Sequence, residues 1–235
     1  MLWYKYWLET RWRLVFAFVY AIFPVPLLIL TGRTVHSGPP SEAMLQGFVQ
    51  FLGFYWMNTT LLLAGSGIRT QPSIRSQKGL HGSTFFTLSL PVSRVRLFGI
   101  RAWIGLLETA VVFVVAPLGT CVIFPTLRTY ATNADLFKYW VTVIVCASMF
   151  YFFGVLLSVV LEDQLQMGAG MCGILALWGL LSWKHIPPRF NVFRAMGSDS
   201  PLFAHVFPWT TMSLAVCLTA VLFLVSMKFI QAHEY

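Results

Sequence analysis

Few side chains in this sequence could carry out acid–base chemistry inside a folded core. Asp and Glu together number only eight in 235 residues, and Glu108 is the carboxylate that falls well inside a long apolar segment. Burying a charge at the centre of a bilayer costs on the order of 3 kcal/mol, so such a carboxylate is a functional candidate. Glu108 could face a cavity in a substrate path or a proton step. It could instead pair with Arg101 or with a polar group on a neighbouring helix.

Histidine and cysteine give no metal-binding pattern. No two of the five His residues stand at ligand spacing, and the four Cys residues form no CxxC pair. The sequence also lacks the GxxxxGK[ST] phosphate loop, the HExxH zinc motif and the GxSxG nucleophile motif. We therefore expect no metal, no catalytic residue and no cofactor bound by this chain. The four Cys residues are interpreted as small packing residues.

The composition indicates which class of fold positions these residues. Hydrophobic residues make up 57% of the chain and charged residues only 10%, with a mean hydropathy of +0.73. Soluble domains carry about 25% charged residues, so this composition argues against a water-soluble globule. Four Cys residues are too few for a secreted disulfide scaffold, and the abundant aromatic residues exclude intrinsic disorder. An all-α polytopic membrane protein remains.

Apolar runs long enough to cross a bilayer predict six transmembrane helices in a single transmembrane domain, 1–235. Residues 1–13 alternate Trp with charged residues, which predicts an amphipathic elbow helix at the interface or an aromatic belt at the start of the first span. A polar, basic region covers 68–96, and a mixed segment covers 184–205. The predicted spans are 14–30, 44–67, 97–124, 139–161, 165–183 and 206–230.

The distribution of basic residues predicts the orientation. With six spans both termini lie on one side, and that side carries ten of the 16 Lys and Arg residues. By the positive-inside rule both termini are then cytoplasmic. We therefore expect a multi-pass protein of the cell (inner or plasma) membrane in contact with membrane lipid. Since topology accounts for all the basic residues, the net charge of +8 requires no nucleic-acid partner.

Two of the predicted spans carry residues suited to a pathway. The 44–67 segment contains Gln50 and Asn58, and polar residues in a span usually face protein or water rather than lipid. The 165–183 segment is rich in Gly and also contains Met171 and Trp178. Small residues there permit close helix packing, whereas a Met- and aromatic-lined surface suits hydrophobic cargo. The sequence leaves the helix-interface and pathway interpretations open for both spans.

The basic region 68–96 predicts a short helix outside the membrane. Pro72 and Ser73 can start it, Arg75 and Lys78 stand three residues apart on it, and Gly79 is the first glycine that can break it. Such a helix could insert into a groove on a cytoplasmic partner. The alternative is an ordinary basic loop held at anionic lipid.

The end of this region resembles a known family. Its residues Gly82-Ser83-x-x-x-x-Leu88-Ser89-Leu90-Pro91-Val92-Ser93-Arg94 look like the cytoplasmic signature of ABC-type-2 exporter permeases, the membrane subunits of type V ATP-binding-cassette transporters. In that family a Gly-Thr pair and a leucine-rich stretch end in Leu-Pro-Val-Ser-Arg before the third span. The family layout also has an elbow helix, six spans, a coupling helix and a longer external segment between the last two spans.

The resemblance implies a function and a set of partners. The chain would be the permease subunit of an ABC exporter, forming the translocation path and coupling to a separate ATPase. Two ATPase copies would bind ATP and Mg, and a second permease copy or a paralogue would complete the path. The segment 184–205 would be external and partly re-entrant. The coupling residues would be Gln71, Ser73, Arg75, Lys78, Gly79 and Gly82, and the path residues Gln50, Asn58, Met171 and Trp178, with Glu108 added as the buried carboxylate.

The cargo is not readable from the sequence, although the aromatic and Met content leans towards hydrophobic or amphipathic molecules. Two alternatives need no ATPase. One is a small integral-membrane enzyme or lipid-processing protein that uses Glu108, and the other is a non-transporting membrane scaffold or immunity protein.

Overall fold

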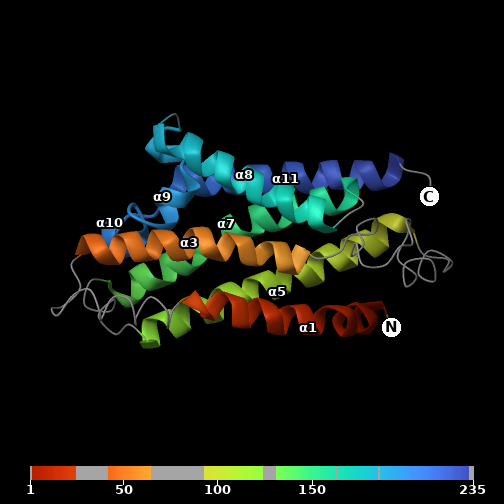
Figure 1. Ribbon diagram of the computed structural model, residues 1–235, viewed down its shortest axis with the longest axis horizontal. Coiled ribbons are helices and arrows are strands. Elements are labelled where there is room, and N and C mark those ends of the chain that lie inside the picture. The colour runs from red at the N-terminus through yellow and green to blue at the C-terminus, as the bar shows by residue number, and fades with distance from the viewer. Residues whose placement is uncertain are drawn as a thin grey trace.

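The computed structural model describes residues 2–24, 42–64, 93–123, 131–161, 164–184 and 186–232, and these residues are helical without any strand. Six long helices run along a common axis, each in the direction opposite to the one before it in the sequence (Figure 1). They are α1 (Leu2–Ile22), α3 (Glu42–Ala64), α5 (Arg94–Ile123), α7 (Asn133–Val160), α8 (Gln164–Lys184) and α11 (Trp209–Ala232). Between α8 and α11 lie η1 (Pro188–Phe190), α9 (Val192–Met196) and α10 (Pro201–Ala204).

Three of these helices are long and apolar enough to cross a membrane. Their spanning stretches are Val95–Gly119 in α5, Asn133–Val160 in α7 and Trp209–Ala232 in α11, and α8 has a shorter apolar stretch. In α1 charged residues crowd the first half, and in α3 polar residues lower the hydropathy. The described part of the chain thus has the character of a membrane protein, while the full set of six spans stays a prediction.

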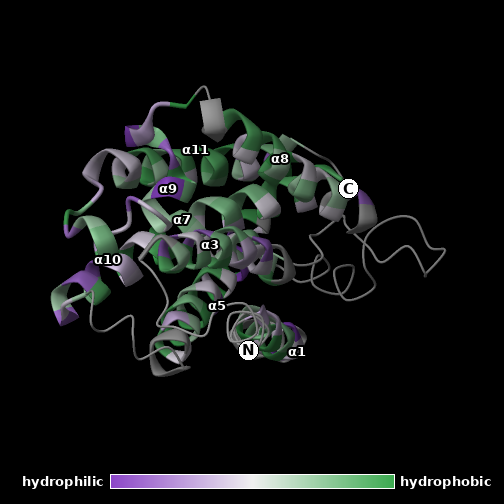
Figure 2. Cartoon of the chain, turned by 60° about the vertical axis from the view of Figure 1, so that its left-hand side comes forward, coloured by the Kyte–Doolittle hydropathy of each residue, from purple (hydrophilic) through white to green (hydrophobic). Residues whose placement is uncertain are grey.

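The outer surface supports the membrane assignment. Large hydrophobic side chains point outward from several helices, including Phe16 at 65% exposed, Leu180 at 69% and Trp209 at 74%. Figure 2 shows hydrophobic residues over the outward faces of the long helices as well as between them. Extended apolar surface of this kind is unstable in water and matches lipid tails instead.

Helix boundaries differ from the sequence prediction in two places. The predicted elbow 1–13 and the start of the predicted span 14–30 form one uninterrupted helix, α1, whose described end lies at Ile22 just before Pro24. Helix α7 begins at Asn133, six residues before the predicted span 139–161. Its early start is explained by a capping box, in which the Thr132 hydroxyl accepts from the Asp135 amide and the Asp135 carboxylate accepts from the Thr132 amide.

Helix α7 forms the centre of the bundle and contacts α3, α5, α8 and α11. Val143, Cys146 and Ala147 on this helix are fully buried. Small residues allow the closest approaches: a Cβ added at Gly154 would lie 2.8 Å from the Ala64 Cβ on α3. The bundle therefore depends on tight packing around α7, as membrane bundles generally do.

The start of α1 and the end of α11 lie at the same end of the bundle (Figure 1). The last turn of α3 and the first turn of α5 point toward that end too, whereas α9 and α10 lie at the opposite end. An even number of antiparallel helices produces this arrangement.

We predict that Gly154→Ala lowers stability, because the new methyl group would push α7 away from Ala64. Overpacking of this kind costs about 1 to 3 kcal/mol, which exceeds the gain of about 1 kcal/mol from better helix propensity. The matched control is Gly99→Ala on α5, where an added Cβ meets nothing within 4 Å. Thermal unfolding of both variants in detergent measures the difference. Equal melting temperatures for the two variants would contradict the packing argument.

Candidate functional site

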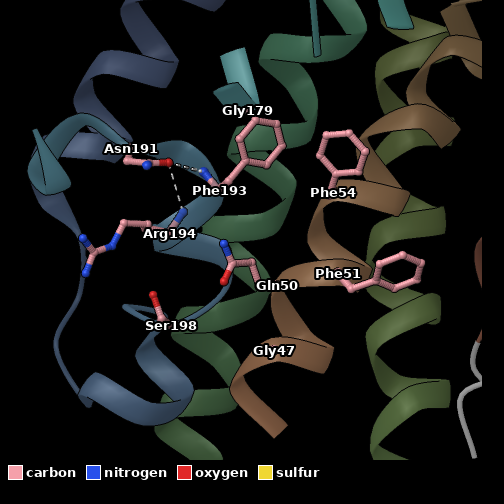
Figure 3. Close-up of a pocket in the computed structure, with 9 residues that line it drawn as sticks. All are labelled: Gly47, Gln50, Phe51, Phe54, Gly179, Asn191, Phe193, Arg194 and Ser198. Atoms are coloured by element: carbon pink, nitrogen blue, oxygen red, sulfur yellow. Dashed lines mark hydrogen bonds between the residues drawn. The ribbon is translucent and has the colours of Figure 1, made fainter. Parts of the chain in front are cut away.

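A groove of about 600 Å³ opens between α3, the end of α8 and the segment around α9. Figure 3 shows the side chains around it, with Gln50 directed from α3 toward the α9 segment. Its lining residues are Gly47, Gln50, Phe51, Phe54, Gly179, Asn191, Phe193, Arg194 and Ser198. Pockets of 300 to 1,000 Å³ with mainly apolar walls and a few polar groups are typical ligand sites.

The α9 segment forms one wall of the groove because it packs tightly onto α3. Asn191 begins α9: its side-chain oxygen accepts hydrogen bonds from the backbone amides of Phe193 and Arg194, at 3.1 and 3.2 Å. Met196 at the end of α9 is fully buried and lies against Gly53, where an added Cβ would stand 3.1 Å from the Met196 Cβ.

Gly197 permits the closest contact between this segment and α3. A Cβ at Gly197 would lie 2.6 Å from the Gln50 Cβ and 2.9 Å from the Gln50 Cα. Since that Cα belongs to a helix backbone, only a glycine fits here without displacing the segment. The 184–205 region, which the sequence predicts to be re-entrant, therefore folds back onto the bundle.

Aromatic rings form the inner part of the groove. The ring centroids of Phe54 and Phe193 are 5.5 Å apart, and Phe193 in turn lies 5.8 Å from Phe150 on α7. Trp178 continues this row at 6.4 Å from Phe150, edge to face. The row ties α3, α9, α7 and α8 together and gives the groove an apolar floor.

Arg194 is the charged residue among those that line the groove, and its partner Asp199 lies beside the lining. The Arg194 guanidinium makes a two-pronged ion pair with Asp199, with Nε to Oδ2 at 2.9 Å and a second nitrogen to Oδ1 at 3.1 Å. The Ser198 hydroxyl donates to Asp199 Oδ1 at 3.2 Å. In Figure 3 the Arg194 guanidinium points away from the phenylalanine rings, so the polar and apolar parts of the groove are separate.

The four residues predicted on spans 44–67 and 165–183 fall on α3 and α8, which contact each other. Gln50 lines the groove, and Trp178 lies in the row of rings behind it. Asn58 stands two turns further along α3 and donates a hydrogen bond to the Phe54 carbonyl at 3.0 Å. Met171 is fully buried on α8.

Glu108 lies elsewhere. Its carboxylate, on α5, is only 4% exposed and accepts a hydrogen bond from the Thr10 hydroxyl on α1. Arg13 on α1 interacts with it electrostatically, and so does the buried Tyr151 on α7. The second carboxylate oxygen, Oε2, has no hydrogen-bond partner among the described residues. The structure thus brings Glu108 together with a polar group on a neighbouring helix and not with the other four predicted path residues.

Sequence reasoning missed a second polar cluster. Asp135 is buried at the start of α7, and it accepts from Lys138 Nζ at 3.0 Å and lies 2.9 Å from His205 Nδ1. Lys138 also donates to the His205 carbonyl at 3.3 Å. The Thr132-x-x-Asp135 spacing is the one sequence signal that points to this site, since it predicts a helix start. Within the described ranges no three His, Cys, Asp or Glu side chains gather as a metal site would require.

The predicted coupling residues lie outside the described residues. They are Gln71, Ser73, Arg75, Lys78, Gly79 and Gly82.

Comparison of the chain with protein-family models, with curated proteins and with solved structures finds no match. The residues and geometry of this chain and the motif at Gly82–Arg94 are therefore the basis for a function.

We predict that Thr10→Val destabilises the contact between α1 and α5, because it removes the hydroxyl that donates to the buried Glu108 carboxylate. A buried acceptor left without a donor costs about 1 to 3 kcal/mol. Thr109→Val is the matched control, since Thr109 is also buried and its hydroxyl donates within its own helix to the Gly105 carbonyl at 2.7 Å. Thermal unfolding in detergent should show the larger loss for Thr10→Val. A larger loss of thermal stability for Thr109→Val than for Thr10→Val would show that the Thr10–Glu108 hydrogen bond does not stabilise the protein.

Proposed function

We propose that this chain is the permease subunit of an ABC exporter of the type-2 class. It would form the translocation path with a second copy or a paralogue, and two separate ATPase subunits would bind ATP and Mg and drive it. The support from the sequence is the Leu-Pro-Val-Ser-Arg string that ends at Arg94, immediately before a long apolar helix.

The observation that carries the proposal is the direction of two helix ends. The last turn of α3, which ends at Ala64, and the first turn of α5, which begins at Arg94, point toward the end of the bundle where α1 begins and α11 ends (Figure 1). An exporter of this class needs its coupling segment and its N-terminal elbow on the same membrane face, where the ATPase binds. We propose that this face is cytoplasmic, in line with the ten basic residues that the six-span topology assigns to it.

The proposed path runs along α3 and α8. Gln50 and Asn58 supply polar groups along α3, and Met171 and Trp178 lie on α8. Among the described residues Asn58 donates to the Phe54 carbonyl of its own helix, and a side chain paired in this way can exchange that partner for a passing ligand. Binding of ATP would shift the pair of permeases between two arrangements, since a ligand biases whichever state it binds more tightly.

We predict that Arg75→Glu lowers the amount of ATPase that co-purifies with the tagged chain by about tenfold or more. Reversing a charge at a protein interface typically costs several kcal/mol, and each 1.4 kcal/mol is a factor of ten. The measurement is a pull-down from mild detergent, followed by mass spectrometry and an ATPase assay on the eluate. We also expect both Arg75→Glu and Gly79→Pro to uncouple transport from ATP hydrolysis. Both variants should still insert into the membrane.

The control is Arg189→Glu, which makes the same charge change on an exposed residue of η1, whose carbonyl accepts hydrogen bonds from Thr210 and Thr211 in the first turn of α11. It should leave the recovered ATPase unchanged. Co-purification of a Walker-type ATPase that Arg75→Glu abolishes and Arg189→Glu preserves supports the permease assignment. Recovery of the intact chain without any ATPase would overturn it and favour the membrane enzyme that uses Glu108.

A further inference from the structure

We propose that the groove between α3 and α9 binds a membrane phospholipid whose headgroup carries both a phosphate and a primary ammonium group. This inference requires that the chain lies in a membrane, and it does not depend on an ATPase partner. It rests on the depth of the groove, on its apolar floor and on the charge pair of Arg194 and Asp199.

The groove runs from the end of the bundle toward its middle. Gly47 lies about one turn into α3 and Phe54 lies seven residues further, which is about 10 Å along the helix axis. The α9 segment runs antiparallel to this part of α3. Phe193 lies beside Phe54, Met196 beside Gly53, and Gly197 beside Gln50. Phe193 therefore lies at the inner level and Gly197 at the outer one. Asp199 follows the lining residue Ser198, and its backbone amide donates to the Arg194 carbonyl at 2.9 Å, so its carboxylate stands beside the groove next to Arg194.

The inner part fits an acyl chain. Phe51 is 48% exposed and Phe54 is 38% exposed, although both lie within a groove and contact other aromatic rings. A space of about 600 Å³ leads along these rings. Apolar walls gain stability when a hydrocarbon chain rather than water covers them, at roughly 25 cal/mol for each Å² covered.

The Arg194–Asp199 pair fits a headgroup with both charges. Arg194 and Asp199 have side chains 42% and 39% exposed, so each keeps a face that a ligand can reach. A lone anion would meet repulsion from Asp199 and a lone cation repulsion from Arg194, whereas a zwitterion satisfies both. A primary ammonium group can donate hydrogen bonds to the Asp199 carboxylate, and a quaternary ammonium group cannot. The phosphate would accept from the Arg194 guanidinium, which suits bidentate phosphate binding.

Native mass spectrometry of the full chain tests the proposal. The purified protein is mixed with equal amounts of acyl-matched phosphatidylethanolamine, phosphatidylcholine and phosphatidylglycerol, and the retained lipids are counted. We expect phosphatidylethanolamine to exceed phosphatidylcholine by about threefold, the discrimination that a partly exposed charge contact supplies.

Three variants separate the parts of the site. Asp199→Asn should bring phosphatidylethanolamine retention down to that of phosphatidylcholine while phosphatidylglycerol is retained at least as well as before. Arg194→Gln should lower the retention of all three lipids. The double variant Phe51→Ala/Phe54→Ala should also lower all three, without changing their ratio. Phe229→Ala on α11 is the matched control, because Phe229 is 39% exposed, like Phe54, and lies outside the groove.

Several outcomes would overturn the proposal. One is equal retention of phosphatidylethanolamine and phosphatidylcholine by the unaltered chain, and another is an unchanged lipid ratio in Asp199→Asn. A loss of lipid from Phe229→Ala as large as that from the Phe51/Phe54 variant would show that binding is not confined to the groove. A lipid-free dimer that dissociates on Phe51→Ala/Phe54→Ala would show that a second copy of the chain fills the groove. None of these outcomes changes the expected ATPase pull-down, so the two proposals can fail separately.

Discussion

The structure depends on the close packing of α7 against its neighbours. In lipid the hydrophobic effect gives little reason for one apolar helix to prefer another, so association relies on contact between backbones and on a few polar bonds. The fully buried residues Val143, Cys146 and Ala147 and the contact between Gly154 and Ala64 provide that closeness. With α7 held at the centre, α3 and α8 stand at fixed positions beside it, and the α9 segment finds its place against α3.

Polar groups within this apolar bundle occur as small, separate sets. Glu108 and Thr10 join α5 to α1, while Trp56 on α3 donates to the Ala21 carbonyl at 3.0 Å, near the end of α1 where helix carbonyls lack an intrahelical donor. Each set therefore connects two helices that apolar contact alone would leave free to slide. The groove is different, because Arg194 and the aromatic floor line open space.

The sequence predicted the helices better than it predicted the site. Long apolar runs located all six long helices within a few residues at most ends, because length and hydropathy are local properties. The start of α7 differed because a capping box outweighed the polar character of residues 133–138. Phe193 and Arg194 were not predicted as groove residues, since nothing in a linear sequence shows that a segment after two prolines folds back onto α3. Glu108 was recognised as an unusual carboxylate within an apolar segment. Its partner Thr10 lies 98 positions away in the sequence, and residue spacing along the chain does not show which distant helices pack together.

The Asp135 cluster has a mechanical consequence. One carboxylate both begins α7 and bonds His205, the residue with a left-handed backbone (φ 56°) at the turn leading toward α11. These two helices also form the most extensive contact in the bundle. If the two helices separated, the end joined by Asp135 and His205 would stay together. The helices would then move apart at the opposite end, where α1 begins and α11 ends. Because their contact is the most extensive one and the Asp135–His205 bond joins one end, α7 and α11 would move together as one unit in any rearrangement of the bundle.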